Sequence, residues 1–222
     1  MKDYNTYIFD LDGTLLNTLQ DLTNSVNYAL RQCDMPMRTI DEVRQFVGNG
    51  VRLLMTRAVP DGDNNPRFIE AFNTFCQHYM EHSLDTTCPY PGIIDMLKML
   101  KSQGKHIAVV SNKFDTATKE LIRHFFGDLI SVAIGENEAA GVYKKPAPDT
   151  VIEAMIQLGV TKENAVYVGD SDVDLQTARN SGLPCISVLW GFRDREFLLE
   201  HGATNFAENP EDIIAFQKKL FF

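Results

Sequence analysis

Residues 7–14 read Tyr-Ile-Phe-Asp-Leu-Asp-Gly-Thr, a short apolar run that ends in two carboxylates and a glycine. The run from Tyr7 to Leu11 is rich in aromatic and β-branched side chains, which favours a strand buried on both faces, as in a parallel sheet. Asp12-Gly13-Thr14 then ends the pattern. We therefore expect a central strand whose carboxyl end carries acidic side chains.

From residue 91 onward, short apolar runs alternate with stretches of helical periodicity. The expected strands cover 107–110, 132–134, 165–168 and 185–188, and the expected helices cover 91–103, 113–126, 148–158, 172–181 and 212–220. Such alternation is typical of βαβ units and of a parallel sheet covered by helices on both faces. The sequence therefore predicts an α/β fold with a Rossmann-like parallel sheet core.

Some seventy residues separate the first strand from the others, and they show helical patterns with no convincing strand. Leu22, Val26 and Leu30 recur at helical spacing, Thr39-Ile40-Asp41-Glu42 reads as a capping box, and 51–59 and 66–82 continue the helical texture. This segment is too long for an ordinary crossover. We expect an α/β core of residues 1–17 and 88–222 with an all-helical inserted domain of residues 18–87.

Composition narrows the class of protein. The 222 residues carry 21 Lys plus Arg against 30 Asp plus Glu, a net charge of −9, which argues against a nucleic-acid partner. No apolar run reaches the ~20 residues of a membrane span, and the first residues do not read as a signal peptide. The four cysteines lack paired spacing and are expected to be reduced thiols of a cytoplasmic protein: Cys33, Cys76, Cys88 and Cys185.

Polar side chains gather where the expected strands end, the edge at which parallel sheets bind ligands. They are Asp10, Asp12, Gly13, Thr14, Ser111, Asn112, Lys145, Asp170 and Asp174. Two carboxylates ~4 Å apart repel by about 4 kcal/mol at an effective dielectric constant of ~20, so this set requires a cation. An open site with only oxygen ligands favours Mg²⁺, and Lys145 and Ser111 add donors that suit a phosphoryl group.

Each of these motifs, taken alone, also has an interpretation that needs no functional site. Asp12-Gly13 can form a hairpin turn, and Asp10-x-Asp12-Gly13 weakly matches a calcium loop, although the remaining ligands of that loop are missing. Lys145 alone would be a solvated surface lysine, and Ser111 and Asp172 could each cap a helix. The joint placement of these residues after successive strands favours a functional site.

Four segments resemble, in order, the four motifs of the haloacid dehalogenase superfamily. They are Phe9-Asp10-Leu11-Asp12-Gly13-Thr14, Ser111-Asn112, Lys145-Pro146-Ala147-Pro148 and Gly169-Asp170-Ser171-Asp172-Val173-Asp174. The helical segment between the first two looks like that superfamily's cap domain. Val47-Gly48-Asn49-Gly50 and the helix after it look like the cap of bacterial phosphoglycolate phosphatases. Asn17-Thr18 departs from the Asp-Ser that such enzymes often have.

The resemblance implies a Mg²⁺-dependent phosphatase acting on a small phosphorylated metabolite. It makes Asp10 the nucleophile and Asp12 the general acid and base, with Thr14, Ser111, Asn112 and Lys145 as the phosphate-binding residues. The metal would bind Asp10, Asp12 through its backbone carbonyl, and Asp170, while Asp174 would orient metal-bound waters. A carboxylate nucleophile agrees with this chemistry because it is ionised at neutral pH and needs no activating base.

Selection among substrates is expected to lie in the cap, at Gly48, Asn49, Gly50 and Arg52. A glycine-flanked loop before a helix offers free amides to an anion, and Arg52 could bind a carboxylate, although it could equally face solvent. Two alternatives to the phosphatase stay open: a β-phosphoglucomutase-like phosphosugar mutase, and a non-catalytic protein that binds metal or phosphate.

Two further features invite a functional interpretation. His78 and His82 lie four residues apart, but without a third ligand an exposed helix face is favoured over a metal site. Trp190-Gly191-Phe192-Arg193 follows the last expected strand of the core, where it could either line a site or cover the core edge.

Overall fold

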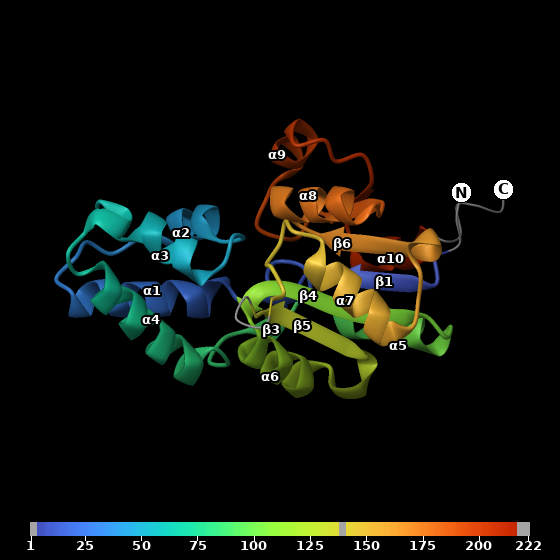
Figure 1. Ribbon diagram of the computed structural model, residues 1–222, viewed down its shortest axis with the longest axis horizontal. Coiled ribbons are helices and arrows are strands. Elements are labelled where there is room, and N and C mark those ends of the chain that lie inside the picture. Colours follow the sequence, from blue (N-terminus) through green and yellow to red (C-terminus); the bar gives the residue numbers. More distant parts are fainter. Residues whose placement is uncertain (1–3, 138–140, 217–222) are drawn as a thin grey trace. The chain divides into compact units, whose positions relative to one another are not determined.

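The computed structural model describes residues 4–137 and 141–216 (Figure 1). These residues form two compact units. One contains the chain up to Leu16 and from Pro89 onward, and is called here the α/β unit; the other is Asn17–Cys88, called here the helical unit.

The α/β unit is built on one six-stranded sheet. Its strands are β1 (Thr6–Phe9), β4 (His106–Phe114), β5 (Val132–Glu136), β6 (Ala165–Gly169), β7 (Cys185–Val188) and β8 (Phe206–Ala207). They lie in the order β5-β4-β1-β6-β7-β8, and each neighbouring pair is parallel. Along the chain this is the order 3-2-1-4-5-6 of Rossmann folds, which confirms the expected fold class.

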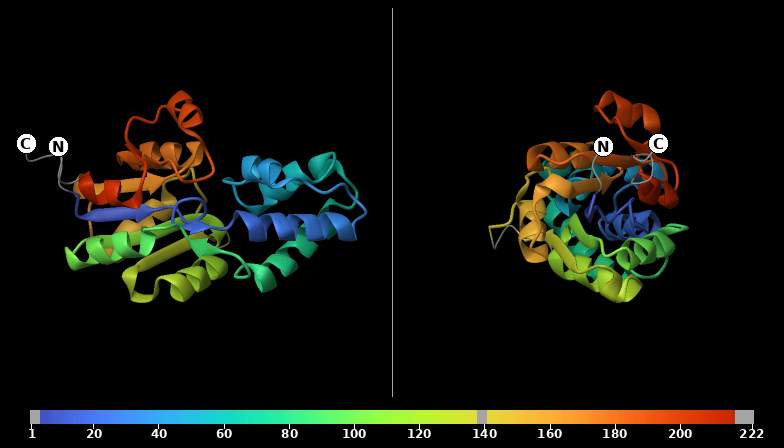
Figure 2. Two further views of the ribbon diagram at one scale, coloured as in Figure 1. Left: turned by 180° about the vertical axis from the view of Figure 1, so that it is seen from behind. Right: turned by 90° about the vertical axis from the view of Figure 1, so that its right-hand side faces the viewer.

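Helices cover both faces of the sheet (Figure 2). One apolar core joins the sheet to α5 (Ile93–Ser102), α6 (Asp115–Phe125) and α10 (Pro210–Ala215), and the other joins it to α7 (Asp149–Leu158) and α8 (Asp172–Ser181). Strand β1 serves both cores, because Tyr7 and Phe9 enter the first and Ile8 enters the second. Full burial of such side chains stabilises the fold by about 1.5–3 kcal/mol each.

Strand β4 differs from the expectation in a way that matters for the site. It continues through Ser111 and Asn112 to Phe114, so that the next helix begins at Asp115 rather than at 113. The extension occurs because, after a register shift, Phe114 still pairs with Glu136 of β5. Because Ser111, Asn112 and Lys113 are polar, the apolar pattern in the sequence ends at Val110, and the rest of the strand was not predicted.

Shorter elements were not predicted, because they span too few residues to show a period. They are α9 (Arg195–Glu200), β8, and the short 3₁₀ helices Gly127–Leu129 and Lys162–Asn164. Helix α9 packs Leu198 against Leu175 and Ala203. The helix expected over 212–220 begins earlier, at Pro210, and its residues 217–220 lie outside the described part of the chain.

The helical unit contains α1 (Leu19–Gln32), α2 (Ile40–Phe46), α3 (Val51–Ala58), the 3₁₀ helix Gly62–Asn64 and α4 (Phe68–His82). The capping box at α2 is present as predicted: Thr39 Oγ1 accepts from the Glu42 amide at 3.2 Å, and the Glu42 carboxylate accepts from the Thr39 amide at 2.7 Å. Two short strands that were not predicted, β2 (Leu16–Asn17) and β3 (Cys88–Pro89), flank residues 18–87 and pair as a two-stranded sheet.

A buried carboxylate ties the two ends of the helical unit together. Asp21, in the first turn of α1, accepts from the backbone amide and the hydroxyl of both Thr86 and Thr87, at 2.5–3.1 Å. Burial raises the pKa of Asp21, but these hydrogen bonds outweigh it and the pKa is lowered. The bonds hold the segment that precedes β3 against the start of α1.

No described helix is long and apolar enough to cross a membrane, and all four cysteines are free thiols.

We expect Asp21→Ala to lower the free energy of unfolding by about 3 kcal/mol, because four donors lose a charged acceptor in a buried place. Urea unfolding followed by circular dichroism measures the change. The matched control is Asp41→Ala on α2, whose carboxylate is 76% exposed and should matter by less than about 0.5 kcal/mol. Equal effects of the two substitutions would contradict the role of the Thr86–Thr87 contacts.

Candidate active site

Asp10 follows β1 directly and lies at the carboxyl edge of the sheet. Its amide donates to the Val168 carbonyl at 2.9 Å, which fixes the residue between β1 and β6. Its buried Oδ1 lies 2.7 Å from Lys145 Nζ. Burial, followed by the nearby charge of Asp174, raises the pKa of Asp10 well above its ordinary value even though Lys145 opposes the shift.

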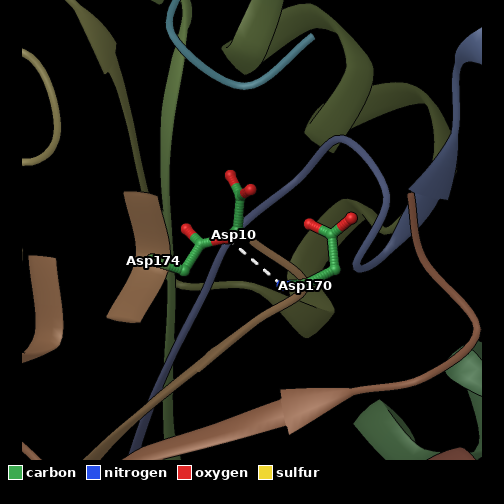
Figure 3. A group of neighbouring side chains, drawn as sticks. All are labelled: Asp10, Asp170 and Asp174. Carbon is green, nitrogen blue, oxygen red and sulfur yellow. Dashed lines mark hydrogen bonds between the residues drawn. The ribbon is translucent and has the colours of Figure 1, made fainter. Parts of the chain in front are cut away.

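Two further carboxylates meet Asp10 at this edge (Figure 3). Asp170 follows β6, and Asp174 lies in the first turn of α8. One oxygen from each of Asp10, Asp170 and Asp174 lies within 4.8 Å of the others, and all three residues are buried. Burial, reinforced by Asp174, raises the pKa of Asp170 to about 7.

The oxygens of Asp174 are occupied by protein donors. Oδ2 accepts from the amides of Asp170 and Ser171 and from Ser171 Oγ, at 3.2, 3.1 and 2.6 Å, and Figure 3 shows the first of these bonds. Oδ1 accepts from Lys145 Nζ at 2.8 Å and from the Tyr167 hydroxyl at 2.9 Å. Ser171 and Asp174 also form the capping box of α8. Asp174 therefore shapes the site, while Asp10 and Asp170 are the carboxylates that face it.

Lys145 is the buried cation of this group. Its ammonium contacts Asp10, Asp174 and the Tyr167 hydroxyl, the last at 3.1 Å. Burial lowers the pKa of Lys145, but the two carboxylates outweigh burial and hold it above its ordinary value. Tyr167, fully buried on β6, was not among the predicted site residues, because its apolar neighbours in the strand make it look like an ordinary core residue.

The donor set fits a divalent cation. Lys145 is the ion-pair partner of two of the three buried carboxylates, Asp10 and Asp174. Burial raises the pKa values of Asp10 and Asp170, and the negative charge of Asp174 adds to both shifts. Hard oxygen ligands of this kind suit Mg²⁺. Within the described residues, these aspartates are the one group of three or more acidic, cysteine or histidine side chains close enough to hold an ion.

The expected phosphate-binding residues lie at the same edge of the sheet. Thr14 is fully buried, and its hydroxyl donates to Asp170 Oδ1 at 3.4 Å. Ser111 Oγ accepts from the Lys113 amide at 3.2 Å, an arrangement that leaves its own proton for another acceptor. Asn112 Nδ2 donates to the Lys145 carbonyl at 2.9 Å and so links β4 to the segment that carries the lysine.

Asp12 does not join the three clustered carboxylates. Its Oδ1 instead lies 3.2 Å from the Nζ of Lys113, the buried lysine near the end of β4. Gly13, with φ of +86°, turns the chain after Asp12, and its amide donates to the Leu16 carbonyl at 2.9 Å. Lys113 was not among the predicted site residues. Its position directly after the predicted residues Ser111 and Asn112 could have indicated that it lies at the site.

The segment after β7 packs directly on the site. The Phe192 amide donates to Asp170 Oδ2 at 2.7 Å, and Trp190 Nε1 donates to the Thr14 carbonyl at 2.9 Å. Gly191 has no room for a side chain, since a Cβ there would lie 2.3 Å from the Cβ of Asp170. The segment thus contacts Asp170 of the site through Phe192, while Trp190 also packs against the apolar core.

The four predicted cap residues lie in the helical unit. Gly48, Asn49 and Gly50 form the loop before α3, with φ of +124° at Gly48 and +88° at Gly50. Arg57 fixes this loop by donating to the Phe46 carbonyl at 2.7 Å and to Asn49 Oδ1 at 3.1 Å.

Arg52 has partners of its own within the helical unit. Its Nη2 lies 3.4 Å from Asp63 Oδ1, and its guanidinium lies over the rings of Phe68 and Phe72. Its side chain remains 56% exposed.

His78 and His82 stack on each other, with ring centroids 4.3 Å apart. Their Nδ1 atoms are bonded to Ser25 Oγ and to Asp85 Oδ2, respectively. These contacts favour packing of the two rings within the helical unit over a metal site.

Comparison with known proteins places this geometry in a family. The family model for haloacid dehalogenase-like hydrolases matches residues 7–188, a range that includes every core residue named above except those after β7. The chain belongs to the haloacid dehalogenase-like hydrolases. The resemblance carried by the four motifs is thereby confirmed.

Individual relatives agree with the family model over most of this hydrolase. Phosphoglycolate phosphatase 1 of Pseudomonas aeruginosa is 32% identical over 93% of this chain and 77% of its own length. The phosphoglycolate phosphatase of Aquifex aeolicus is 32% identical over 83% of this chain and 84% of its own.

A crystal structure of a candidate phosphoglycolate phosphatase from Lactobacillus delbrueckii subsp. bulgaricus superposes with a TM-score of 0.92 at 36% identity. It covers 98% of this chain and 99% of that one.

The raised pKa of Asp170 generates a prediction about metal binding. The pKa of Asp170 is about 7 in the folded protein and 3.8 in the unfolded chain. Between these pH values the folded metal-free protein binds a proton that the unfolded chain has lost, so its stability falls as the pH rises toward and through 7. Below about pH 7 a bound cation must displace the proton from Asp170, whereas at higher pH the carboxylate is already ionised. We therefore expect Mg²⁺ to raise Tm more at about pH 8 than at about pH 6.

Differential scanning fluorimetry with and without Mg²⁺ measures this difference. The control is Asp170→Asn, which should remove most of the Mg²⁺-dependent shift at both pH values because the amide cannot supply a carboxylate ligand. A wild-type shift that does not depend on pH, or one that survives in Asp170→Asn, would remove Asp170 from the metal-binding set.

Proposed function

We propose that this hydrolase is a Mg²⁺-dependent phosphatase of small phosphate monoesters resembling phosphoglycolate. The observation that carries the proposal is the meeting of Asp10, Asp170 and Asp174 with the buried Lys145 at the carboxyl edge of the sheet. An uncompensated carboxylate group with an adjacent ammonium suits a metal ion together with a phosphoryl dianion. The relatives' names, phosphoglycolate phosphatase, support the same substrate class.

In the first half of the proposed reaction, a carboxylate oxygen of Asp10 attacks phosphorus. The bond from phosphorus to the ester oxygen breaks, and Asp12 gives its proton to the leaving oxygen. Thr14, Ser111 and Asn112 orient the phosphoryl oxygens by hydrogen bonds, and Lys145 stabilises their charge. The product of this half is an alcohol and a phosphorylated Asp10.

In the second half, Asp12 has become a carboxylate and takes a proton from water. The water oxygen forms a bond to phosphorus, the acyl-phosphate bond to Asp10 breaks, and the electron pair returns to the Asp10 carboxylate. Inorganic phosphate leaves the site. Asp10 thus forms and breaks the bond to phosphorus, and Asp12 moves the proton in both halves.

Asp10, the backbone carbonyl of Asp12 and Asp170 would hold Mg²⁺. When bound, the ion supplies positive charge to the phosphoryl oxygens and offsets the repulsion between carboxylates. Asp174 positions Asp170, because it accepts the Asp170 amide from the turn between β6 and α8.

We assign the catalytic chemistry to residues 1–17 and 88–222, and choice of the leaving group to the helical segment 18–87. The phosphate-binding residues recognise only the phosphoryl group that all monoesters share, so discrimination requires other residues. Gly48, Asn49 and Gly50 offer backbone amides at the start of α3, where the helix dipole attracts anions. Arg52, in the first turn of α3, adds a cation for a carboxylate.

Asp10→Asn is expected to abolish turnover and to leave the fold unchanged, because the amide keeps the shape but is not a nucleophile. Phosphate release from p-nitrophenyl phosphate with Mg²⁺ measures activity, and circular dichroism verifies folding. Acid-quenched wild-type protein should carry one phosphoryl group on Asp10 by mass spectrometry. Residual turnover in Asp10→Asn would contradict the covalent mechanism.

The same assay tests the two alternatives to a phosphatase. If the wild type releases no phosphate under any condition, the protein is a non-catalytic binding protein. A requirement for a sugar bisphosphate activator would indicate a mutase.

Arg52→Ala is expected to lower kcat/KM for phosphoglycolate by roughly ten- to hundred-fold, the effect of losing a charged contact worth about 1.5–3 kcal/mol. The value for p-nitrophenyl phosphate should stay unchanged, because that substrate offers no carboxylate. The matched control is Arg44→Ala, since Arg44 is also paired with an aspartate in the helical unit, at 2.6 Å from Asp41 Oδ1. Equal effects on both substrates would mean that Arg52 only supports packing on Phe68 and Phe72.

A further inference from the structure

Lys113 is a buried cation to which the proposed mechanism gives no task. Its side chain is 3% exposed, and its Nζ lies 3.2 Å from Asp12 Oδ1. Its backbone is fixed on both sides, because its amide donates to Ser111 Oγ at 3.2 Å and its carbonyl accepts from Thr118 Oγ1 at 3.4 Å. The end of β4 therefore presents an ammonium to Asp12 from a rigid support.

The two aspartates at the end of β1 are each paired with a different lysine. Asp10 lies against Lys145 and belongs to the cluster of three carboxylates, whereas Asp12 lies against Lys113 and is absent from that cluster. The chain turns directly after Asp12, at Gly13 with φ of +86°. A cation with 3% exposure needs a partner, since removing one member of a buried pair leaves an uncompensated charge.

We propose that Lys113 is a positioning residue for the second half of the reaction: it holds the Asp12 side chain in one orientation, in place to accept the proton of the hydrolytic water. This inference rests on the proposed phosphatase function and adds a residue to it. Lys113 touches neither the phosphoryl group nor the nucleophile in this role. It acts through Asp12 alone.

The two halves of the reaction need Asp12 in opposite forms. In the second half the water oxygen bonds to phosphorus, the bond from phosphorus to Asp10 breaks, and the proton moves from water to the Asp12 carboxylate. Lys113, 3.2 Å from that carboxylate, keeps the Asp12 side chain from turning away during this transfer. The first half is insensitive to Lys113 when p-nitrophenyl phosphate is the substrate, because p-nitrophenolate leaves without needing a proton.

The test is Lys113→Met, which preserves chain length and removes the charge. With p-nitrophenyl phosphate and Mg²⁺, we expect kcat to fall roughly ten-fold and KM to fall in parallel, so that kcat/KM changes less than about three-fold. The phosphorylated Asp10 should accumulate, and its fraction after acid quench in the steady state should exceed that of the wild type. A merely structural role would lower kcat/KM or the amount of active protein without raising this fraction.

Lys119→Met is the matched control. It removes a lysine from another Lys–Asp pair six residues along the chain, where Nζ lies 2.6 Å from Asp115 Oδ2 and the side chain is 60% exposed. Kinetics and phosphoenzyme fraction should equal those of the wild type. If Lys113→Met does not fold, Lys113→Leu, which likewise offers no donor to Asp12, takes its place with the same expected accumulation.

A second comparison tests whether Lys113 acts through Asp12. The decay of isolated phosphoenzyme is followed in Asp12→Asn and in Asp12→Asn combined with Lys113→Met. We expect equal decay rates, because the carboxylate on which Lys113 acts is already gone. A further slowing in the double variant would overturn the proposal.

The outcomes separate this inference from the proposed function. A wild type without Mg²⁺-dependent phosphate release, or without phosphorylated Asp10, would overturn the phosphatase itself. An active wild type with a Lys113→Met variant that accumulates no phosphoenzyme, or that loses kcat/KM instead, would overturn only the role of Lys113.

Discussion

Three carboxylates are buried close together at the carboxyl edge of the sheet, and the candidate site depends on how their negative charge is balanced. Lys145 pairs with Asp10 and Asp174 but cannot neutralise all three groups. Burying an uncompensated carboxylate is costly, which is why the pKa values of Asp10 and Asp170 are raised. The donor set of such a site suits a cation together with an anion.

The carboxylates can lie this close together because glycines let the backbone segments around them approach closely. A Cβ at Gly13 would lie 2.3 Å from Asp170 Oδ2, and one at Gly169 would lie 2.4 Å from the Cβ of Asp174. Together with Gly191, these residues let the segments after β1, β6 and β7 meet around Asp170 without side chains between them. The glycines therefore account for how carboxylates distant in sequence come so near to one another.

The sequence predicted those parts of the site that depend on strand ends. Asp10, Asp170 and Lys145 were identified because parallel strands and their loops deliver polar residues to one edge. The occupied oxygens of Asp174, the pairing of Lys113 with Asp12 and the Phe192 amide on Asp170 were not predicted. Each depends on a contact between segments far apart in the chain, and no local periodicity encodes which polar groups meet there.

Asp10 and Asp12 show how two identical side chains acquire different surroundings. Both follow the same strand, but one lies against Lys145 and the carboxylate cluster and the other against Lys113. Pairs of titratable groups in contrasting surroundings are a common basis for distinct roles in one site. The lysines that create the contrast come from different places, one from the end of β4 and one from the segment before α7. The difference in surroundings between the two aspartates is therefore a property of the folded sheet, and the Asp-Leu-Asp sequence alone does not contain it.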